Sequence, residues 1–179
     1  MIDIVTAFEE VLTYLRTDDQ EADDLQPDQP GYGAPYFLHG TKQEIDNILV
    51  AKSKDKVYKY QRYPLIALRL PVIEDVEGDM IHYTINMAII SNGGKDLTSA
   101  ERKTQVFDAT LNPLYDQFIR CLRESGVFSW SGNIERPEHN KVDRMYYGTL
   151  VNDSNRDHQF TDPIDAIEII DLKISKVIE

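Results

Sequence analysis

The chain has 179 residues and a mass of 20.6 kDa, and 41% of its residues are hydrophobic while 28% are charged. A chain of this size buries about two-thirds of the surface of its unfolded state, so residues 1–179 predict one domain whose core needs neither disulfide nor metal. No run of 18 apolar residues occurs, which argues against a membrane-spanning helix, and the first residues lack the pattern of a secretory signal. A single cysteine, Cys121, excludes an internal disulfide and is typical of a reducing compartment.

The net charge of −12 is unevenly distributed along the chain. Residues 1–30 carry nine acids and one base, and residues 152–179 carry seven acids and three bases, whereas residues 31–151 carry fifteen of each. Affinity for a phosphate backbone depends on clustered Lys and Arg, so this balance argues against tight nucleic-acid binding. The acidic ends are typical of segments that keep a protein in solution.

The first predicted element is a helix, because apolar residues recur at helical spacing from Ile4 to Leu15. Residues 17–35 follow, with five acids among residues 18–24 and three prolines by residue 35. Such a segment cannot bury enough apolar surface to order itself. We therefore expect a mobile acidic loop at 17–35, or an arm that becomes ordered against a partner.

A second helix and a hairpin are expected next. The apolar segment 36–40 is too short to classify. The Thr-Lys-Gln-Glu pattern at 41–44 is a capping box, and it predicts a short helix that directs its apolar residues inward. These inward residues are Ile45, Ile48 and Leu49. Residues 63–70 and 81–90 are rich in strand-forming side chains, and the polar segment 74–79 between them predicts a hairpin turn.

The longest helix is predicted from about Ser99 to Glu124, with an apolar stripe that includes Cys121. Pro113 lies inside it and should kink or split the helix near Asn112, because proline lacks a backbone donor. Residues 129–140 are polar and turn-like, and residues 145–151 and 164–178 predict two further strands. This order of elements predicts an α+β fold, a mainly antiparallel sheet flanked by the N-terminal helix and the long central helix.

Local motifs for catalysis or ligand binding are incomplete. A phosphate-loop pattern fails because Asp96 follows Gly94-Lys95, where Ser or Thr is required. A calcium-loop pattern that begins at Asp153 fails because His158 stands in the place of the required glycine. We therefore predict no catalytic residue, no metal site and no cofactor, and we expect the chain not to be an enzyme.

Histidine and cysteine spacing gives no support for zinc. The four histidines, at 39, 82, 139 and 158, lack the short spacing of ligands on one helix, although ligands can converge from distant segments. The place of Cys121 on an apolar stripe favours a buried thiol over a nucleophile.

Two aromatic features remain open. Lysines and tyrosines alternate over residues 52–63, a mixture typical of single-strand nucleic-acid binding, but nothing elsewhere extends the patch and we favour a basic connector. Trp130 lies in a polar loop, where it either anchors the loop itself or belongs to a protein interface.

Six short segments carry a family resemblance: His39-Gly40, Glu44-Ile45, Tyr63 to Leu68, Ser99 to Arg102, Asn112 to Tyr115 and Asp165 to Ile169. They resemble small structural proteins encoded in the morphogenesis clusters of tailed bacteriophages and prophages. The order of elements is similar to that of tail-terminator and head–tail joining proteins, in which a sheet flanked by helices assembles into a ring. The resemblance carries no catalytic residues, and the fold likeness is an analogy of layout.

The resemblance implies a non-enzymatic virion assembly protein of the tail-terminator or tail-completion type, acting as a ring-forming subunit. Its expected partners are further copies of itself and phage structural proteins such as the tail tube or connector, with neither specific nucleic-acid binding nor a membrane. Its expected location is the bacterial cytoplasm during assembly and then the virion. The alternative is a small-ligand-binding protein, or an enzyme whose site is assembled from scattered residues.

A ring needs two different complementary surfaces on each subunit. For one surface we predict the final strand near 164–178, which we expect to be an exposed sheet edge containing Ile174. For the other we predict the aromatic region formed by Trp130, Tyr146 and Tyr147.

Overall fold

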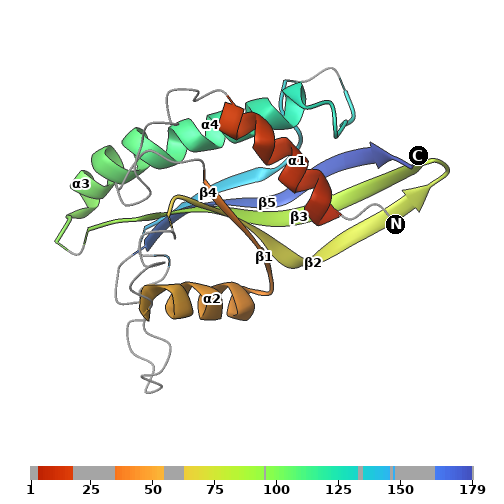
Figure 1. Ribbon diagram of the computed structural model, residues 1–179. Coiled ribbons are helices and arrows are strands. Elements are labelled where there is room, and N and C mark those ends of the chain that lie inside the picture. Colours follow the sequence, from red (N-terminus) through yellow and green to blue (C-terminus); the bar gives the residue numbers. More distant parts are fainter. Residues whose placement is uncertain are drawn as a thin grey trace.

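The computed structural model describes residues 4–17, 35–54, 63–94, 96–132, 135–145, 147 and 164–178. Its elements, in chain order, are α1 (Ile4–Thr17), β1 (Tyr36–Gly40), α2 (Lys42–Lys54), β2 (Leu65–Glu77), β3 (Met80–Asn92), α3 (Ser99–Arg102), the π-helix η2 (Lys103–Leu111), α4 (Asn112–Glu124), β4 (Asn140–Arg144) and β5 (Ile164–Val177). They form an α+β fold, as predicted, with helices packed on one five-stranded sheet (Figure 1). The predicted acidic loop lies outside the described residues, except for its two end residues.

The sheet has the strand order β1-β2-β3-β5-β4, and every neighbouring pair except β1 and β2 is antiparallel. The unclassified segment 36–40 is therefore the strand β1, at one edge of the sheet and parallel to β2. Parallel neighbours need a crossover connection, and the chain between β1 and β2 contains α2. The sheet is mainly antiparallel, as expected.

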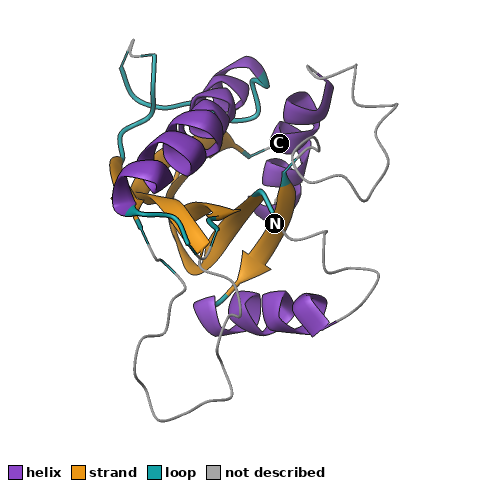
Figure 2. Ribbon diagram, turned by 90° about the vertical axis from the view of Figure 1, so that its left-hand side faces the viewer, coloured by secondary structure: helices purple, strands orange, loops and turns teal. Residues whose placement is uncertain are grey.

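The two faces of the sheet are covered differently. Helices α1, η2 and α4 pack on one face, which we call the long-helix face, and α2 lies on the other, which we call the α2 face (Figures 1 and 2). Phe8 of α1 is fully buried on the long-helix face, where its ring lies 5.2 Å from that of Phe128 and 6.2 Å from that of Phe118. The predicted apolar stripe of α1 supplies much of this core.

The long helix runs without a break from α3 through η2 to α4. Pro113 stands in the first turn of α4, where its missing N–H is tolerated. The N–H of Asn112 donates to the carbonyl of Phe107, five residues earlier, so the helix is widened just before the proline. In place of the kink or split predicted near Asn112, the helix changes there from π-helical to α-helical hydrogen bonding. Cys121 is buried in the stripe, as predicted.

Helix α2 begins with the predicted capping box, in which the backbone N–H of Thr41 donates to Glu44 Oε2 at 2.7 Å. Ile45 and Leu49 are buried against the sheet, as expected. The inward position predicted for Ile48 is wrong, because that side chain is 36% exposed. Ile45 and Leu49 are four residues apart and share one stripe, which leaves Ile48 on the flank of the helix.

Three strand predictions need correction at their boundaries. The hairpin strands extend farther than predicted, so that the turn contains only Gly78 and Asp79, and Gly78 has a φ of 58° that suits glycine. The predicted strand at 145–151 is wrong, since Met145 and Tyr147 lie in turns and residues 148–151 are outside the described part. The strand lies earlier, at β4, because the register with β5 pairs residues 140–144.

The prediction that the final strand is an exposed edge is also wrong. Strand β5 lies between β3 and β4, and Ile174 is only 1% exposed. A β-bulge explains why simple alternation misplaces this part of the strand. Asp171 has a φ of 55°, its N–H donates to the side chain of Asn86, and the register of β5 with β3 shifts there. Ile169 and Leu172, three residues apart, therefore face the same core.

Candidate functional site

At one end of the sheet, β2, β3 and β5 continue beyond the residues that pair with the edge strands β1 and β4, and we call this part the hairpin end. It consists of residues 70–84 of β2 and β3 with residues 172–178 of β5. Strand β1 pairs with β2 only from Leu65 to Arg69. Within the part of the chain that the structure describes, no strand covers the outer side of β2 from residue 70 to residue 77. Among the described residues, this segment is therefore an open sheet edge.

The opposite side of the hairpin end is closed by a loop instead of a strand. The N–H of Ser175 donates to the carbonyl of Ser129 at 2.7 Å, and the N–H of Ser129 donates to the carbonyl of Ser175 at 2.9 Å. The N–H of Lys173 donates to the carbonyl of Glu138 at 3.0 Å. Of the two sides of the hairpin end, the β2 side is thus the one available for further pairing.

Exposed apolar side chains concentrate at this end of the molecule. Among the described residues, seven large hydrophobic side chains are exposed, and five of them belong to the hairpin end. These five are Leu70, Ile73, Val76, Val177 and Ile178. Ile73 and Val76 are 62% and 61% exposed. Such a concentration of apolar surface is typical of a protein interface.

The hairpin end is also acidic. Between Leu70 and Met80 the chain carries Glu74, Asp75, Glu77 and Asp79 and no basic residue. Glu74, Asp75 and Glu77 share the β2 edge with Ile73 and Val76, and their like charges oppose pairing between identical edges.

A hollow of about 380 Å³ lies at the hairpin end, between β3, β5 and the loop at 129–131. Trp130 and Ile174, two of the predicted interface residues, both line it, although Ile174 is otherwise part of the core. Trp130 is partly buried and also packs against the core of the long-helix face. Tyr147 contacts Lys42 and Arg69 near α2 instead, and Tyr146 lies outside the described residues. Of the predicted residues that the structure describes, Trp130 and Ile174 share the hollow, and Tyr147 packs against the core of the α2 face instead.

Ser175 and His82 line the same hollow, and Glu77 lies beside His82. Ser175 Oγ lies 2.7 Å from His82 Nδ1, and His82 Nε2 lies 3.7 Å from Glu77 Oε2. The backbone N–H of Ser175 is bonded to Ser129, so it cannot stabilise a developing oxyanion, and the Glu77 side chain is 87% exposed. The trio has the residue types of a nucleophilic site, but the backbone N–H of its serine is not available as an oxyanion donor.

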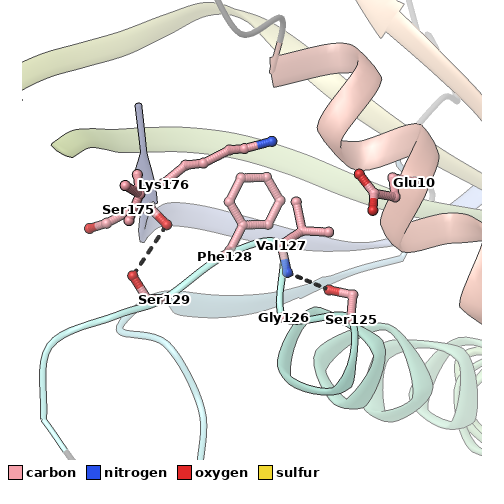
Figure 3. A pocket seen from close by; sticks show the side chains of 9 residues that line it. Glu10, Ser125, Gly126, Val127, Phe128, Ser129, Ser175 and Lys176 are labelled. Atoms are coloured by element: carbon pink, nitrogen blue, oxygen red, sulfur yellow. Dashed lines mark hydrogen bonds between the residues drawn. The ribbon is translucent and has the colours of Figure 1, made fainter. Parts of the chain in front are cut away.

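A second hollow, of about 470 Å³, lies where α1, the end of α4 and β5 meet. Glu10 of α1 and Lys176 of β5 border it on either side of Phe128 (Figure 3). The hydroxyl of Ser125 accepts a hydrogen bond from the N–H of Val127 at 3.3 Å, which holds the turn after α4. The hydroxyls of Ser125 and Ser129 donate to backbone carbonyls, of Leu122 and Ser175, so they hold the local chain in place.

His139 also has a structural position. Its Nδ1 lies 2.7 Å from the carbonyl of Pro137, which can only accept, so Nδ1 carries a proton. In the neutral ring Nε2 then accepts from the hydroxyl of Tyr115 at 2.6 Å. Burial raises the pKa of Tyr115, although Arg136 opposes this effect. The hydrogen bonds connect the loop before β4 to α4.

A buried ion pair, which sequence reasoning missed, fixes the start of the long helix. Arg102 Nη1 donates to Asp165 Oδ2 at 2.7 Å, and both side chains are fully buried. Arg102 Nη2 also donates to the carbonyl of Gly94 at 2.8 Å. Gly93 packs so closely that a Cβ atom there would overlap both charged side chains.

Glu168, on the α2 face of β5, binds two arginines. Arg69 Nη1 donates to one carboxylate oxygen at 2.8 Å and Arg144 Nε donates to the other at 2.7 Å. Burial alone raises the pKa of Glu168, but the hydrogen bonds from Arg144 and Arg69 outweigh it and hold the pKa below its ordinary value of 4.5. The guanidinium of Arg69 also lies over the ring of Tyr147, at 5.2 Å.

The two carboxylates belong to the segment Asp165 to Ile169, and Arg102 ends the segment Ser99 to Arg102; both segments carry the family resemblance. Their charged residues join β5 to the long helix and to neighbouring strands. In the sequence, these ion-pair residues lay inside segments that we interpreted only as packing motifs. Comparison with protein-family models and with curated proteins finds no match to this chain.

Among the described residues, no group of three or more His, Cys, Asp or Glu side chains is placed to hold a metal ion. The described helices include none with the length and apolar character needed to cross a membrane.

Proposed function

We propose that this chain is a non-enzymatic virion assembly protein of the tail-terminator or tail-completion type, which acts as a subunit of a ring. The observation that carries the proposal is the hairpin end, where an open strand edge and five exposed apolar side chains occur together. An open strand edge and a cluster of exposed apolar side chains each promote association, and the acids on this edge oppose only its pairing with an identical edge. The resemblance to phage morphogenesis proteins supplies the context for that association.

The runner-up function is an enzyme or small-ligand protein, and the contact between Ser175 and His82 is the observation that favours it. The exposed Glu77 and the engaged N–H of Ser175 favour the assembly function instead. A fluorophosphonate probe separates the two. Stoichiometric labelling that is lost in Ser175→Ala would support the hydrolase, and absence of labelling would support assembly.

The direct test is binding to tail tubes. Neighbouring genes for a portal, a capsid or a tail tube would identify the partner, whereas a metabolic operon would favour the runner-up. Electron microscopy of tubes mixed with the protein should then show capped ends. The variant Ile73→Glu with Val76→Glu should lose capping, because each substitution places a charge on an exposed apolar position of the open edge.

Met145→Glu is the matched control, since Met145 is an exposed apolar residue that lies outside the hairpin end. It should cap tubes as well as the parent. Failure of the parent to bind tube ends would contradict the terminator function, and normal capping by the folded double variant would contradict the role of the hairpin end.

A further inference from the structure

We infer that two copies of this chain pack face to face through the side of the hairpin end that α2 leaves uncovered, with their strands crossing at nearly a right angle. The inference rests on the proposed assembly function and names the contact that joins two subunits. We call this side the open face. It is formed by alternate residues of three strands, from Ile73 to Glu77 in β2, from Met80 to Thr84 in β3 and from Lys173 to Val177 in β5.

The register places these residues on one side of the sheet. Thr84 pairs with Ile73 on one neighbouring strand and with Lys173 on the other, so the three share a side. Their chain neighbours Tyr83 and Ile174 point the opposite way and are buried in the core of the long-helix face. Helix α2 packs at the other end of these strands, under the start of β2 (Figure 1). Among the described residues, no helix covers the open face.

Apolar and charged side chains occupy opposite corners of the open face. Ile73 of β2 and Lys173 of β5 lie at one end, on either side of β3, and Glu77 and Val177 lie at the other end. Ile73 and Val177, which are 62% and 53% exposed, are therefore diagonal to each other. The acid and the base are diagonal to each other as well, and their side chains are 87% and 55% exposed.

This arrangement is complementary to itself under one two-fold rotation. An axis along the diagonal from Ile73 to Val177 brings each of these side chains against its counterpart in the second copy. The same rotation exchanges the other two corners, so that Lys173 of each copy meets Glu77 of the other. Strands related in this way cross at nearly a right angle, which is one of the two ways in which sheets pack face to face.

The other two-fold rotations of the open face give poorer contacts. An axis along the strands places Ile73 against Lys173, and an axis across the strands places Ile73 against Glu77. The second diagonal places each charged corner against itself. A two-fold contact closes after two copies, so the pair of subunits is the unit that a ring then repeats.

The dimensions of paired strands permit the exchange of corners. Four residues along a strand span about 13 Å and three neighbouring strands span about 10 Å, so the exchanged corners coincide to within about 3 Å. The long side chains of Lys173 and Glu77 bridge this difference. Lys173 Nζ already binds Glu138 Oε1 at 2.8 Å, but both side chains are more than half exposed, so exchanging this bond costs little.

The hollow at the hairpin end adds apolar surface to the contact. It lies on the open face, since Met80 and His82 line it together with Trp130. The loop that carries Trp130 runs along the outer side of β5, where Ser129 bonds Ser175. In the paired arrangement the turn between β2 and β3 of the second copy lies over β5, so it reaches the hollow and contacts Trp130.

A single cysteine on the proposed axis tests this contact. Cys121 is the one native cysteine and is buried, so an introduced surface thiol is oxidised selectively. Ile73→Cys should form covalent dimers rapidly under mild oxidation, because its thiol meets that of the second copy at the axis. Val76→Cys is the matched control, since Val76 is 61% exposed but pairs with Ile81 on the opposite side of the hairpin. It should form dimers at least about tenfold more slowly, because no contact raises the effective concentration of its thiols.

Exchange of the charged corners gives a second measurement. Lys173→Glu and Glu77→Lys should each raise the Kd of the dimer, measured by analytical ultracentrifugation, at least about tenfold, because the symmetry repeats each unfavourable pair. The variant with both substitutions should recover the parent Kd. The two residues lie at opposite corners of one chain, so this recovery arises only between copies. Glu138→Gln is the control, since it removes the partner of Lys173 in the same chain and should not weaken the dimer.

The results separate this contact from the proposed function. Equal rates for Ile73→Cys and Val76→Cys, in solution and on capped tubes, would overturn the face-to-face contact, while capping by the parent would leave the assembly function standing. A Kd that does not recover in the double charge variant, shown to be folded by circular dichroism, would also overturn it. Rapid dimers of Ile73→Cys with recovery of the Kd, but without capping, would support the contact and contradict the terminator function.

Discussion

Two carboxylates on β5, only three residues apart, hold arginines in different surroundings. Asp165 meets Arg102 where neither side chain has contact with solvent, whereas Glu168 meets Arg69 and Arg144 at a partly open site. A buried ion pair gives little net stability, yet it makes the loss of either member costly, because the remaining charge is left without compensation. The Glu168 carboxylate is itself only 10% exposed, but Arg69 and Arg144 are 22% and 54% exposed, so the loss of one arginine leaves the carboxylate paired with the other. The same strand therefore carries one structural requirement and one adjustable contact.

Removal of one member of the buried pair should have the largest effect. Asp165→Ala removes the carboxylate that Arg102 Nη1 binds in the core, and we expect a loss of about 3–5 kcal/mol in the free energy of unfolding, measured with urea. The double variant Arg102→Met with Asp165→Leu should be more stable than Asp165→Ala, since it leaves no isolated charge. A double variant as unstable as the sum of two single variants would contradict this account.

The glycine beside the pair should be the next most sensitive position. Gly93→Ala introduces a methyl group where Arg102 and Asp165 already meet, so it should destabilise the protein by about 1–3 kcal/mol through overpacking. Gly94→Ala is the control, because a Cβ atom there would meet only Leu97, at an ordinary contact distance of 3.4 Å. Equal thermal stability of the two variants would show that the packing around Gly93 can relax.

The open site should respond to pH. The pKa of Glu168 is lowered in the folded state, so its contribution to stability is fully present well above pH 4.5 and is lost as the pH falls through the lowered value. Glu168→Gln should cost about 1–2 kcal/mol at neutral pH and less under acid conditions. Urea unfolding of both proteins from pH 7 to pH 3 measures the difference, which should shrink as the pH falls. A constant difference would mean that the charge of Glu168 does not matter.

The smallest effect is expected at Arg144, whose side chain is 54% exposed. Arg144→Ala should cost roughly 0.5 kcal/mol, because Arg69 still pairs with Glu168 and exposed pairs contribute little. Added salt should reduce this small difference further, since an exposed charge is screened. A loss comparable to that of Asp165→Ala would remove the distinction between the two carboxylates.

The sequence predicted those parts of the fold that follow local rules. The stripe from Ile4 to Leu15 and the capping box at Thr41 are local patterns, and the helices are found there. The position of Asp171 was not predictable in this way, because a bulge depends on pairing with β3 and reverses the alternation of every residue after it. Alternation counted from Ile167 and Ile169 would therefore place Ile174 on the opposite face of β5 from the one on which it is buried.

The candidate site was predicted only in part, for a related reason. Trp130 was singled out as an aromatic in a polar loop, and it does line the hollow at the hairpin end. The open edge of β2 depends on how far β1 pairs with it, which is a property of two segments together. The residues from Leu70 to Glu77 do not by themselves indicate where the pairing of β1 with β2 ends.

The position of β5 between β3 and β4 also has a consequence for synthesis on the ribosome. Strand β3 pairs with β5 from Met80 with Val177 to Asn92 with Ile164, so the two halves of the sheet are joined by residues made long after β3. Until then β3 presents an unpaired side, and Asp165 is not yet present to receive Arg102. Contacts between distant segments form slowly, and open strand edges aggregate. A nascent chain of this kind therefore needs protection from aggregation, or fast synthesis of β5. A chain stalled before Ile164 should therefore bind a holding chaperone, and release should come only when β5 has left the exit tunnel.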